Sequence, residues 1–196
     1  MFTFKHMKRI LLALLLFFPY SMLAQRDSAS INNRGKIYLI TGTSVFYGLS
    51  VLGMNELWYK NYERTSFHWI DDSREWLQMD KTAHFFFTYL AARSLSGGLQ
   101  LAGGDRINSV FWASGISMLA NSTIEVFDGL SAGWGASASD LVANGSGIAL
   151  FAFQSLVWEK EKIIPKFSWH PTSYAKLRPE VLGSNFPERL LKDYNG

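Results

Sequence analysis

Long apolar stretches separated by short polar segments dominate the chain. The stretch from Ile37 to Asn55 carries no charge over nineteen residues, which is long enough for a helix to cross a membrane. Three further stretches, at about 80–97, 107–126 and 140–158, are apolar with interspersed small residues, as is typical of packed helices. The pattern predicts an all-α, membrane-associated bundle of about four apolar helices.

The segment between Glu56 and Met79 differs, because aromatic and charged residues alternate along it. Amphipathic rings mixed with charges suit the headgroup zone of a membrane and predict short interfacial helices. An ordinary amphipathic helix that covers a soluble core explains the same pattern equally well. Both interpretations place this segment at a boundary between apolar and polar surroundings.

Local signals predict the ends of the helices. Asp80 is a candidate N-cap for the second helix, and Gly97–Gly98 predict its end. Ser139 or Asp140 is expected to cap the fourth helix. The small residues between 143 and 147 leave its first turns thin, so that a neighbouring helix can approach closely.

The first 24 residues have the features of a secretory signal peptide. A basic start precedes an apolar run from Ile10 to Phe18, and cleavage is expected after Ala24. An uncleaved anchor is the alternative, but this run is shorter than the ~20 residues that a spanning helix needs. Either way the sequence predicts an exported protein of the bacterial envelope, facing the periplasm and associated with the inner or outer membrane.

Four regions are expected along the chain. The signal peptide at 1–24 is followed by a flexible polar lead at 25–36, the helical bundle domain at 37–158, and a charged, proline-containing C-terminal extension at 159–196. The tail from Lys160 to Lys192 holds seven Lys or Arg residues. With four crossings and an external N-terminus, that charge conflicts with the positive-inside rule. Either one helix does not span, or the bundle sits at a membrane surface.

Composition narrows the classes of partner. The chain is 48% hydrophobic and only 18% charged, more apolar than a typical soluble domain. Signal removal takes away three of the 19 basic residues and none of the 16 acidic ones, so that 16 of each remain. This balance argues against nucleic acid as a partner, whereas the apolar composition and the predicted export favour membrane lipid or other envelope components. The oligomeric state is not indicated, and the absence of cysteine excludes disulfides and thiolate metal ligands.

Antiparallel packing of the four helices would bring three polar segments to one end of the bundle. Asp80 and His84 stand four residues apart, as do Asp140 and Asn144, so each pair shares a helix face. Asp72 is a further candidate because it stands shortly before Asp80. The predicted cluster consists of Asp80, Lys81, His84, Glu125, Asp128, Asp140 and Asn144.

Two kinds of chemistry and one structural role fit this cluster. His84, Glu125 and Asp140 are candidate ligands for a divalent metal such as Zn, Mn or Fe, with Asp128 as a further oxygen ligand. The same three residues are candidates for acid and base catalysis on a lipid-linked or cell-wall substrate, with Lys81 attracting phosphate. Alternatively the cluster is a structural network, in which the aspartates cap helices, Lys81 pairs with Glu125, and His84 closes the hydrogen bonds.

Three motifs follow one another along the chain: Asp80-Lys81-x-x-His84 followed by aromatic residues and Tyr89, Glu125-x-x-Asp128-Gly129, and Gly135-x-Ser137-x-Ser139-Asp140-Leu141-x-Ala143-Asn144-x-x-Gly147. Together they resemble the YfiM-like family of predicted periplasmic proteins and, more distantly, the VanZ-like membrane family, over roughly residues 65–155. The resemblance implies an envelope location and brings no established activity. Many YfiM-like members are described as lipoproteins, whereas this chain has no cysteine. VanZ-like members usually carry Gln at the position of Asp128.

The sequence therefore predicts an exported, membrane-associated envelope protein with a structural or binding site at one end of a helical bundle. The alternative is a metal-dependent or acid-base hydrolase or transferase that acts on an envelope lipid or a cell-wall precursor.

Overall fold

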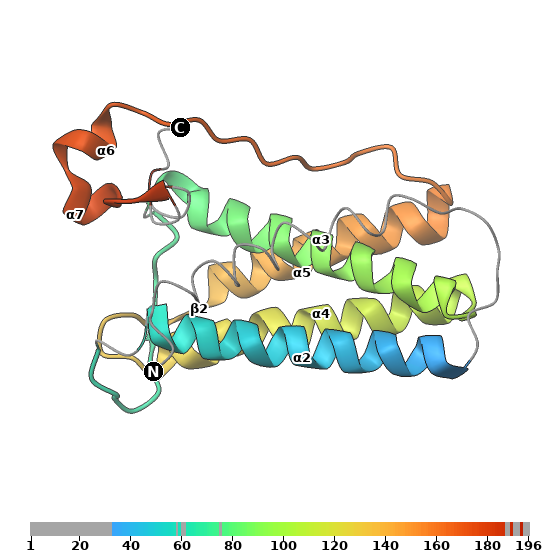
Figure 1. The fold of residues 1–196 in the computed structure, drawn as a ribbon. Coiled ribbons are helices and arrows are strands. Elements are labelled where there is room, and N and C mark those ends of the chain that lie inside the picture. Colours follow the sequence, from blue (N-terminus) through green and yellow to red (C-terminus); the bar gives the residue numbers. More distant parts are fainter. Residues whose placement is uncertain are drawn as a thin grey trace. The chain divides into compact units, whose positions relative to one another are not determined.

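The structure is a computed structural model that describes residues 33–57, 59, 62–74, 76–186, 189 and 193. The predicted signal peptide and residues 25–32 of the predicted lead lie outside this part. The described residues are mostly helical, which confirms the predicted class at this level (Figure 1). The elements are α2 (Asn33–Leu57), β1 (Trp69–Ile70), η2 (Trp76–Gln78), α3 (Met79–Leu101), α4 (Arg106–Gly129), β2 (Ala136–Ser137), α5 (Ala138–Phe153), the π-helical turn η3 (Gln154–Trp158), α6 (Tyr174–Leu177) and α7 (Pro179–Leu182).

Helices α3, α4 and α5 pack against one another and form the core of the unit that extends to Ile164. The buried apolar cluster is small and draws on all three helices, with Tyr89 and Ala92 from α3, Val110 from α4 and Phe151 from α5. The backbones of α3 and α5 approach closely at Gly147, where a Cβ atom would lie 2.3 Å from the carbonyl oxygen of Phe85. The absence of a side chain at Gly147 therefore allows the close approach of α3 and α5.

Helix α2 contacts α3, and its Tyr47 hydroxyl donates a hydrogen bond to Thr123 Oγ1 of α4 at 2.8 Å. It begins at Asn33, so residues 33–36 of the predicted lead are helical. Most of its side chains are exposed in the described unit, including Ile40 and Leu52. By length and composition, Ile37–Asn55 and Ala138–Trp158 are the two helical stretches in the described residues that could cross a membrane.

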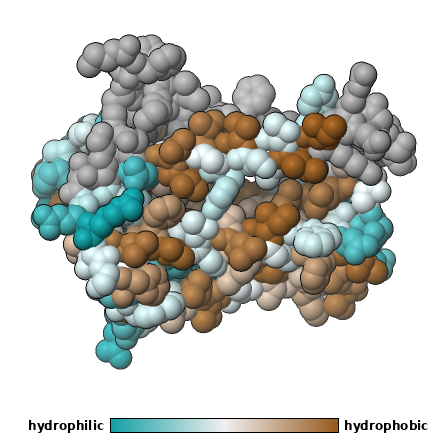
Figure 2. Space-filling view, turned by 90° about the horizontal axis from the view of Figure 1, so that it is seen from below, coloured by the Kyte–Doolittle hydropathy of each residue, from teal (hydrophilic) through white to brown (hydrophobic). Residues whose placement is uncertain are grey.

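Burial in this unit favours small and polar side chains over large apolar ones. Thr88, Asn144 and Gln154 are fully buried, whereas Phe111 on α4 is 69% exposed and Leu119 is 73% exposed. Figure 2 shows hydrophobic side chains spread over the middle of one face, with hydrophilic residues toward its two ends. Water-soluble domains usually bury more of their large apolar side chains than this unit does.

The predicted helix caps are wrong at both sites. Gln78, not Asp80, is the N-cap of α3, and its backbone takes a left-handed φ of 64°. Asp80 lies in the first turn instead, where a carboxylate interacts favourably with the helix dipole. Ser137, rather than Ser139 or Asp140, caps α5, because its hydroxyl accepts a hydrogen bond from the Asp140 backbone N–H at 3.3 Å.

The Gly97–Gly98 pair does not end the second helix as predicted. Helix α3 continues to Leu101, and the Ala102 backbone N–H still donates to the carbonyl of Gly98. A glycine costs a helix interior only about 1 kcal/mol, and Gly98 is buried. Packing of α3 against its neighbours offsets that cost.

The expected interfacial helices are absent from residues 62–74, which are extended or turn-like. Within the described part of 56–79, helix is limited to the end of α2, the turn η2 and the start of α3. Strand β1 instead pairs in parallel with β2, with Trp69 opposite Ala136 and Ile70 opposite Ser137. This pairing places the residues that follow β1 next to the first turn of α5.

After η3 the chain folds back along α3. The Gln154 amide donates to the Ile163 carbonyl at 2.9 Å and accepts from the backbone N–H groups of Lys162 and Ile163. Arg93, a charged residue inside α3, forms a two-bonded ion pair with Glu161. Arg93 therefore faces the segment that follows η3.

Residues from Pro165 onward form a separate unit. It contains the short helices α6 and α7, and the buried Asp193 joins its parts. Trp169 Nε1 donates to the Asp193 carbonyl at 3.3 Å, and Thr172 Oγ1 donates to its carboxylate at 2.7 Å.

Candidate metal and acid-base site

Four segments bring charged side chains to one end of the helical unit. The segment after β1 supplies Asp72, the first turns of α3 supply Asp80, Lys81 and His84, the end of α4 supplies Glu125 and Asp128, and the first turns of α5 supply Asp140 and Asn144. The parallel pairing of β1 with β2 holds Asp72 beside Ser137. The structure thus places all seven residues of the predicted cluster at the same end.

Lys81 is surrounded by three aspartates. Its Nζ forms ion pairs with Asp80 Oδ2 at 3.0 Å, with Asp140 Oδ1 at 2.9 Å, and with Asp72 Oδ2. Burial alone would lower the pKa of Lys81, but the hydrogen bonds that its ammonium group donates to these carboxylates outweigh burial and raise the pKa. The predicted pair with Glu125 does not form, because the three aspartates already occupy the ammonium group.

Asp72 is held as a carboxylate by several donors. The hydroxyls of Ser137 and Ser139 donate to its Oδ1 at 2.6 and 3.0 Å, and Lys81 donates to the other oxygen. Burial works against ionisation, but these hydrogen bonds outweigh it and lower the pKa of Asp72 to about 2. Asp72 therefore belongs to the cluster and fixes the position of Lys81.

His84 is oriented by Asn144. Asn144 Oδ1 is a hydrogen-bond acceptor that lies 3.2 Å from His84 Nδ1 and 2.6 Å from Thr88 Oγ1. Since this oxygen can only accept, Nδ1 carries the proton in this arrangement. The other ring nitrogen, Nε2, then points toward the carboxylates with its lone pair free when the ring is neutral.

Three carboxylate oxygens surround His84 Nε2. Glu125 Oε1 lies at 3.5 Å, Asp80 Oδ1 at 3.7 Å and Asp140 Oδ2 at 4.0 Å. These separations exceed those of good hydrogen bonds. They are close to the distance of about 3.3 to 3.6 Å between two ligands that share a tetrahedral metal ion. Ligand atoms of Asp80, His84 and Asp140 all lie within 4.8 Å of one another, a spacing that could hold a metal ion.

Glu125 is buried at the centre of the site. Its Oε2 accepts a hydrogen bond from the Ser137 backbone N–H at 2.9 Å, whereas Oε1 is buried with no hydrogen-bond partner among the described residues. Burial, together with the negative charges of Asp140 and Asp128, raises the pKa of Glu125 to about 8. The carboxyl can therefore hold a proton at neutral pH, or lose it to a bound cation.

The side chain of Asp128 is hydrogen-bonded to Tyr59. The Tyr59 hydroxyl donates to its Oδ1 at 2.7 Å, and within the described ranges Asp128 has no ion pair with Lys81 or His84. Burial raises the pKa of Asp128 to about 6, and the Tyr59 hydrogen bond opposes part of that rise. Burial and then the charge of Asp128 raise the pKa of Tyr59 in turn.

An open groove of about 470 Å3 runs past the cluster on the side of Lys81. Its polar lining comes from Lys81, Gln78 and Ser139, and its apolar lining from Val142 and two alanines of α5. The groove is open to the surface beside Lys81 and Ser139.

The sequence comparisons agree with an envelope protein. A family model described as "Predicted periplasmic lipoprotein (DUF2279)" matches residues 68–155, the stretch that contains every residue of the cluster. This description accords with an exported, envelope-associated protein of unassigned biochemistry. The 196 residues contain no cysteine, so the lipid attachment implied by "lipoprotein" has no thiol within them. No match was found among curated proteins or among solved structures.

Proposed function

We propose that this protein is a membrane-associated envelope protein whose polar bundle end binds a divalent cation. The observation that supports the cation site most strongly is the arrangement around His84 Nε2, where three carboxylate oxygens lie at 3.5 to 4.0 Å. The proposed partner on the outside of the helices is membrane lipid.

The many exposed large apolar side chains support the membrane association. Helices in lipid gain little from burying leucine and associate through small and polar residues instead, as α3, α4 and α5 do here with Thr88, Ser117 and Asn144. With α2 alongside, the unit would be a four-helix bundle whose exposed phenylalanine and leucine side chains contact acyl chains.

We also propose that the chain is YfiM-like and distantly VanZ-like, on the strength of its three motifs.

The charge of the cluster supports a cation. Five carboxyl groups, those of Asp72, Asp80, Glu125, Asp128 and Asp140, accompany one lysine and one histidine, so the fully ionised cluster is negative even with His84 protonated. Buried like charges are costly unless a cation or a proton compensates them. Lys81 takes one oxygen from Asp80 and one from Asp140, which leaves their other oxygens facing His84. In this arrangement Lys81 orients the ligands, and Zn, Mn or Fe would bind between His84, Asp80 and Asp140, with Glu125 completing the set.

The test is a titration of chelator-treated, detergent-purified protein with ZnCl2 or MnCl2, followed by thermal unfolding. A cation that binds only the folded state stabilises it by about 2.7 kcal/mol at 100 times its Kd. We expect a saturable rise in Tm in the wild type and a loss of that rise in His84→Gln. A matched control, His170→Gln, changes an exposed histidine of the C-terminal unit and should keep the response.

Asp80→Asn provides a second variant, because the Asp80 side chain is 37% exposed and its replacement should not prevent folding. A weakened metal response in this folded variant supports the site. An unchanged response in both variants contradicts it and returns the cluster to the structural role of joining helices.

A second candidate function is hydrolysis or group transfer on an envelope lipid or a cell-wall precursor. The groove beside Lys81 and Ser139 favours it, since an apolar tail could lie there while a polar group approaches the cluster. The pKa of Glu125, raised by burial to about 8, suits a general acid at neutral pH.

A further inference from the structure

A second cavity lies at the same end of the helical unit, away from the Lys81 groove. It has a volume of about 150 Å3 and lies between the end of α2, the end of α4 and the segment that follows α2. Its wall includes Asn55, Tyr59 and Phe127. The ring centroids of Tyr59 and Phe127 lie 5.5 Å apart. Because the Tyr59 hydroxyl is bonded to Asp128, this wall is fixed to the core of the unit.

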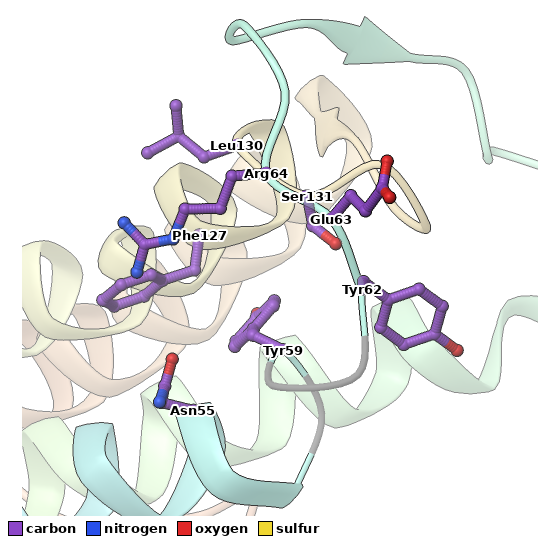
Figure 3. Close-up of a pocket in the computed structure, with 8 residues that line it drawn as sticks. All are labelled: Asn55, Tyr59, Tyr62, Glu63, Arg64, Phe127, Leu130 and Ser131. Carbon is purple, nitrogen blue, oxygen red and sulfur yellow. The ribbon is translucent and has the colours of Figure 1, made fainter.

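The cavity carries one positive and one negative side chain that stand apart. Figure 3 shows the Arg64 guanidinium with Asn55 on one side of Tyr59, and Glu63 with Tyr62 on the other. In the part of the chain that the structure describes, neither Arg64 nor Glu63 forms an ion pair. Their backbones are nevertheless held in place, since Arg64 forms a bridge with Ser131 and the Glu63 carbonyl accepts from Ala132.

Each side of the cavity matches one half of a zwitterionic headgroup. A guanidinium next to a carboxamide binds a phosphate oxygen through several N–H donors. A carboxylate next to a tyrosine ring binds a primary ammonium through charge and through the face of the ring. The Tyr62 ring is itself positioned by an edge contact with Trp134 at 5.8 Å. Tyrosine side chains are also enriched at the headgroup level of membranes.

We propose that this cavity binds the headgroup of a phospholipid that carries a phosphodiester and a primary ammonium, as in phosphatidylethanolamine. Arg64 and Asn55 hold the phosphate, and Glu63 with Tyr62 holds the ammonium. The acyl chains leave toward the apolar surface of α2 and α4. The proposal rests on the membrane association proposed above, and it assigns a specific lipid to one position at the end of the apolar surface.

The test uses full-length protein in detergent and a short-chain lipid, dihexanoyl phosphatidylethanolamine, whose binding is followed by calorimetry. We expect saturable binding that weakens at least tenfold in Arg64→Gln and in Glu63→Gln. Dihexanoyl phosphatidylglycerol has the phosphate but no ammonium, so it should bind more weakly and lose affinity only in Arg64→Gln. Arg74→Gln is the matched control, because Arg74 is exposed in the same segment and does not line the cavity.

Three results would overturn the proposal: no binding of the ethanolamine lipid, equal binding to Arg64→Gln and the wild type, or complete competition by inorganic phosphate at the same concentration. The last result would identify a site for free phosphate rather than for a lipid headgroup. The short-chain lipid needs no bilayer, and Arg64→Gln should keep the metal-dependent rise in Tm. Failure of this site is therefore distinguishable from failure of the cation site or of the membrane association.

Discussion

The side-chain oxygen of Asn144 determines how the His84 ring is oriented in the cluster. By accepting from Thr88 and from His84 Nδ1, it turns His84 Nε2 toward the carboxylates of three different segments. A ligating histidine is commonly oriented in this way by a hydrogen bond at its other nitrogen. Asn144 belongs to the predicted cluster, but its role as the group that orients His84 depends on distances that spacing alone does not provide.

Some contacts of the cluster follow from sequence spacing and others do not. Asp80 and His84 share a helix face because they stand four residues apart, and this much was predictable. The partners of Lys81 were not, because Asp72 reaches it only through the pairing of two-residue strands distant in sequence. Such short, non-local pairings leave no periodic signal.

The raised pKa of Asp128 predicts that the free energy of unfolding depends on pH. Burial raises its pKa from 3.8 to about 6, so between these values the folded state binds more protons than the unfolded state. The stability that Asp128 contributes is complete below about pH 4 and is lost as the pH rises through 6. Asp128→Asn removes this contribution. The free energy of unfolding of the variant should therefore rise relative to the wild type between pH 4 and 6, by up to about 1.4 kcal/mol per pH unit.

Denaturant unfolding in the presence of a chelator measures this difference. Tyr59→Phe removes a hydrogen bond that favours the ionised carboxylate, so it should extend the wild-type pH dependence above pH 6. A constant difference between wild type and Asp128→Asn from pH 4 to 7 would contradict the raised pKa.

At the scale of elements, the apolar stretches predicted four long helices, and α2, α3, α4 and α5 with η3 occupy those positions. Their ends were less predictable. Gly97–Gly98 look like a stop signal, but packing against neighbouring helices outweighs the weak helix propensity of glycine. Likewise the mixture of aromatic and charged residues before α3 suggested helices, whereas pairing with β2 keeps Trp69 and Ile70 extended.

Gly147 tests the contact between α3 and α5. A Cβ at this position would lie 2.3 Å from the backbone oxygen of Phe85, and a backbone atom cannot move away as a side chain can. Gly147→Ala should therefore lower the free energy of unfolding by about 1 to 3 kcal/mol. Gly145→Ala is the matched control, because nothing lies within 4 Å of a Cβ there.

In that control, the better helix propensity of alanine should stabilise the protein by about 0.5 to 1 kcal/mol. Denaturant unfolding of the two variants in the same detergent compares them directly. Equal stability of Gly147→Ala and Gly145→Ala would mean that α3 and α5 do not approach at this point.

At the scale of the molecule, composition indicated a protein that is apolar for its size but not apolar throughout. Among the described residues, several serine, threonine and asparagine side chains are buried together with Tyr89, Val110 and Phe151, whereas many other large apolar side chains are exposed. Periodicity alone could not assign these faces, because almost every side of α2 and α4 carries apolar residues. The assignment required the packing of three helices around a small core.

The membrane association can be tested most directly by measuring the surroundings of Leu119. The chain has no cysteine, so Leu119→Cys gives a unique site for a spin label in protein reconstituted into liposomes. Leu119 is 73% exposed on α4, and Leu177→Cys is the matched control, because Leu177 is 76% exposed in the charged C-terminal unit. Collisions with oxygen, which concentrates in lipid, are compared with collisions with a water-soluble nickel chelate. We predict that oxygen dominates at position 119 and nickel at position 177. Nickel access at position 119 equal to that at position 177 would contradict a lipid-facing α4 and, with it, the membrane association.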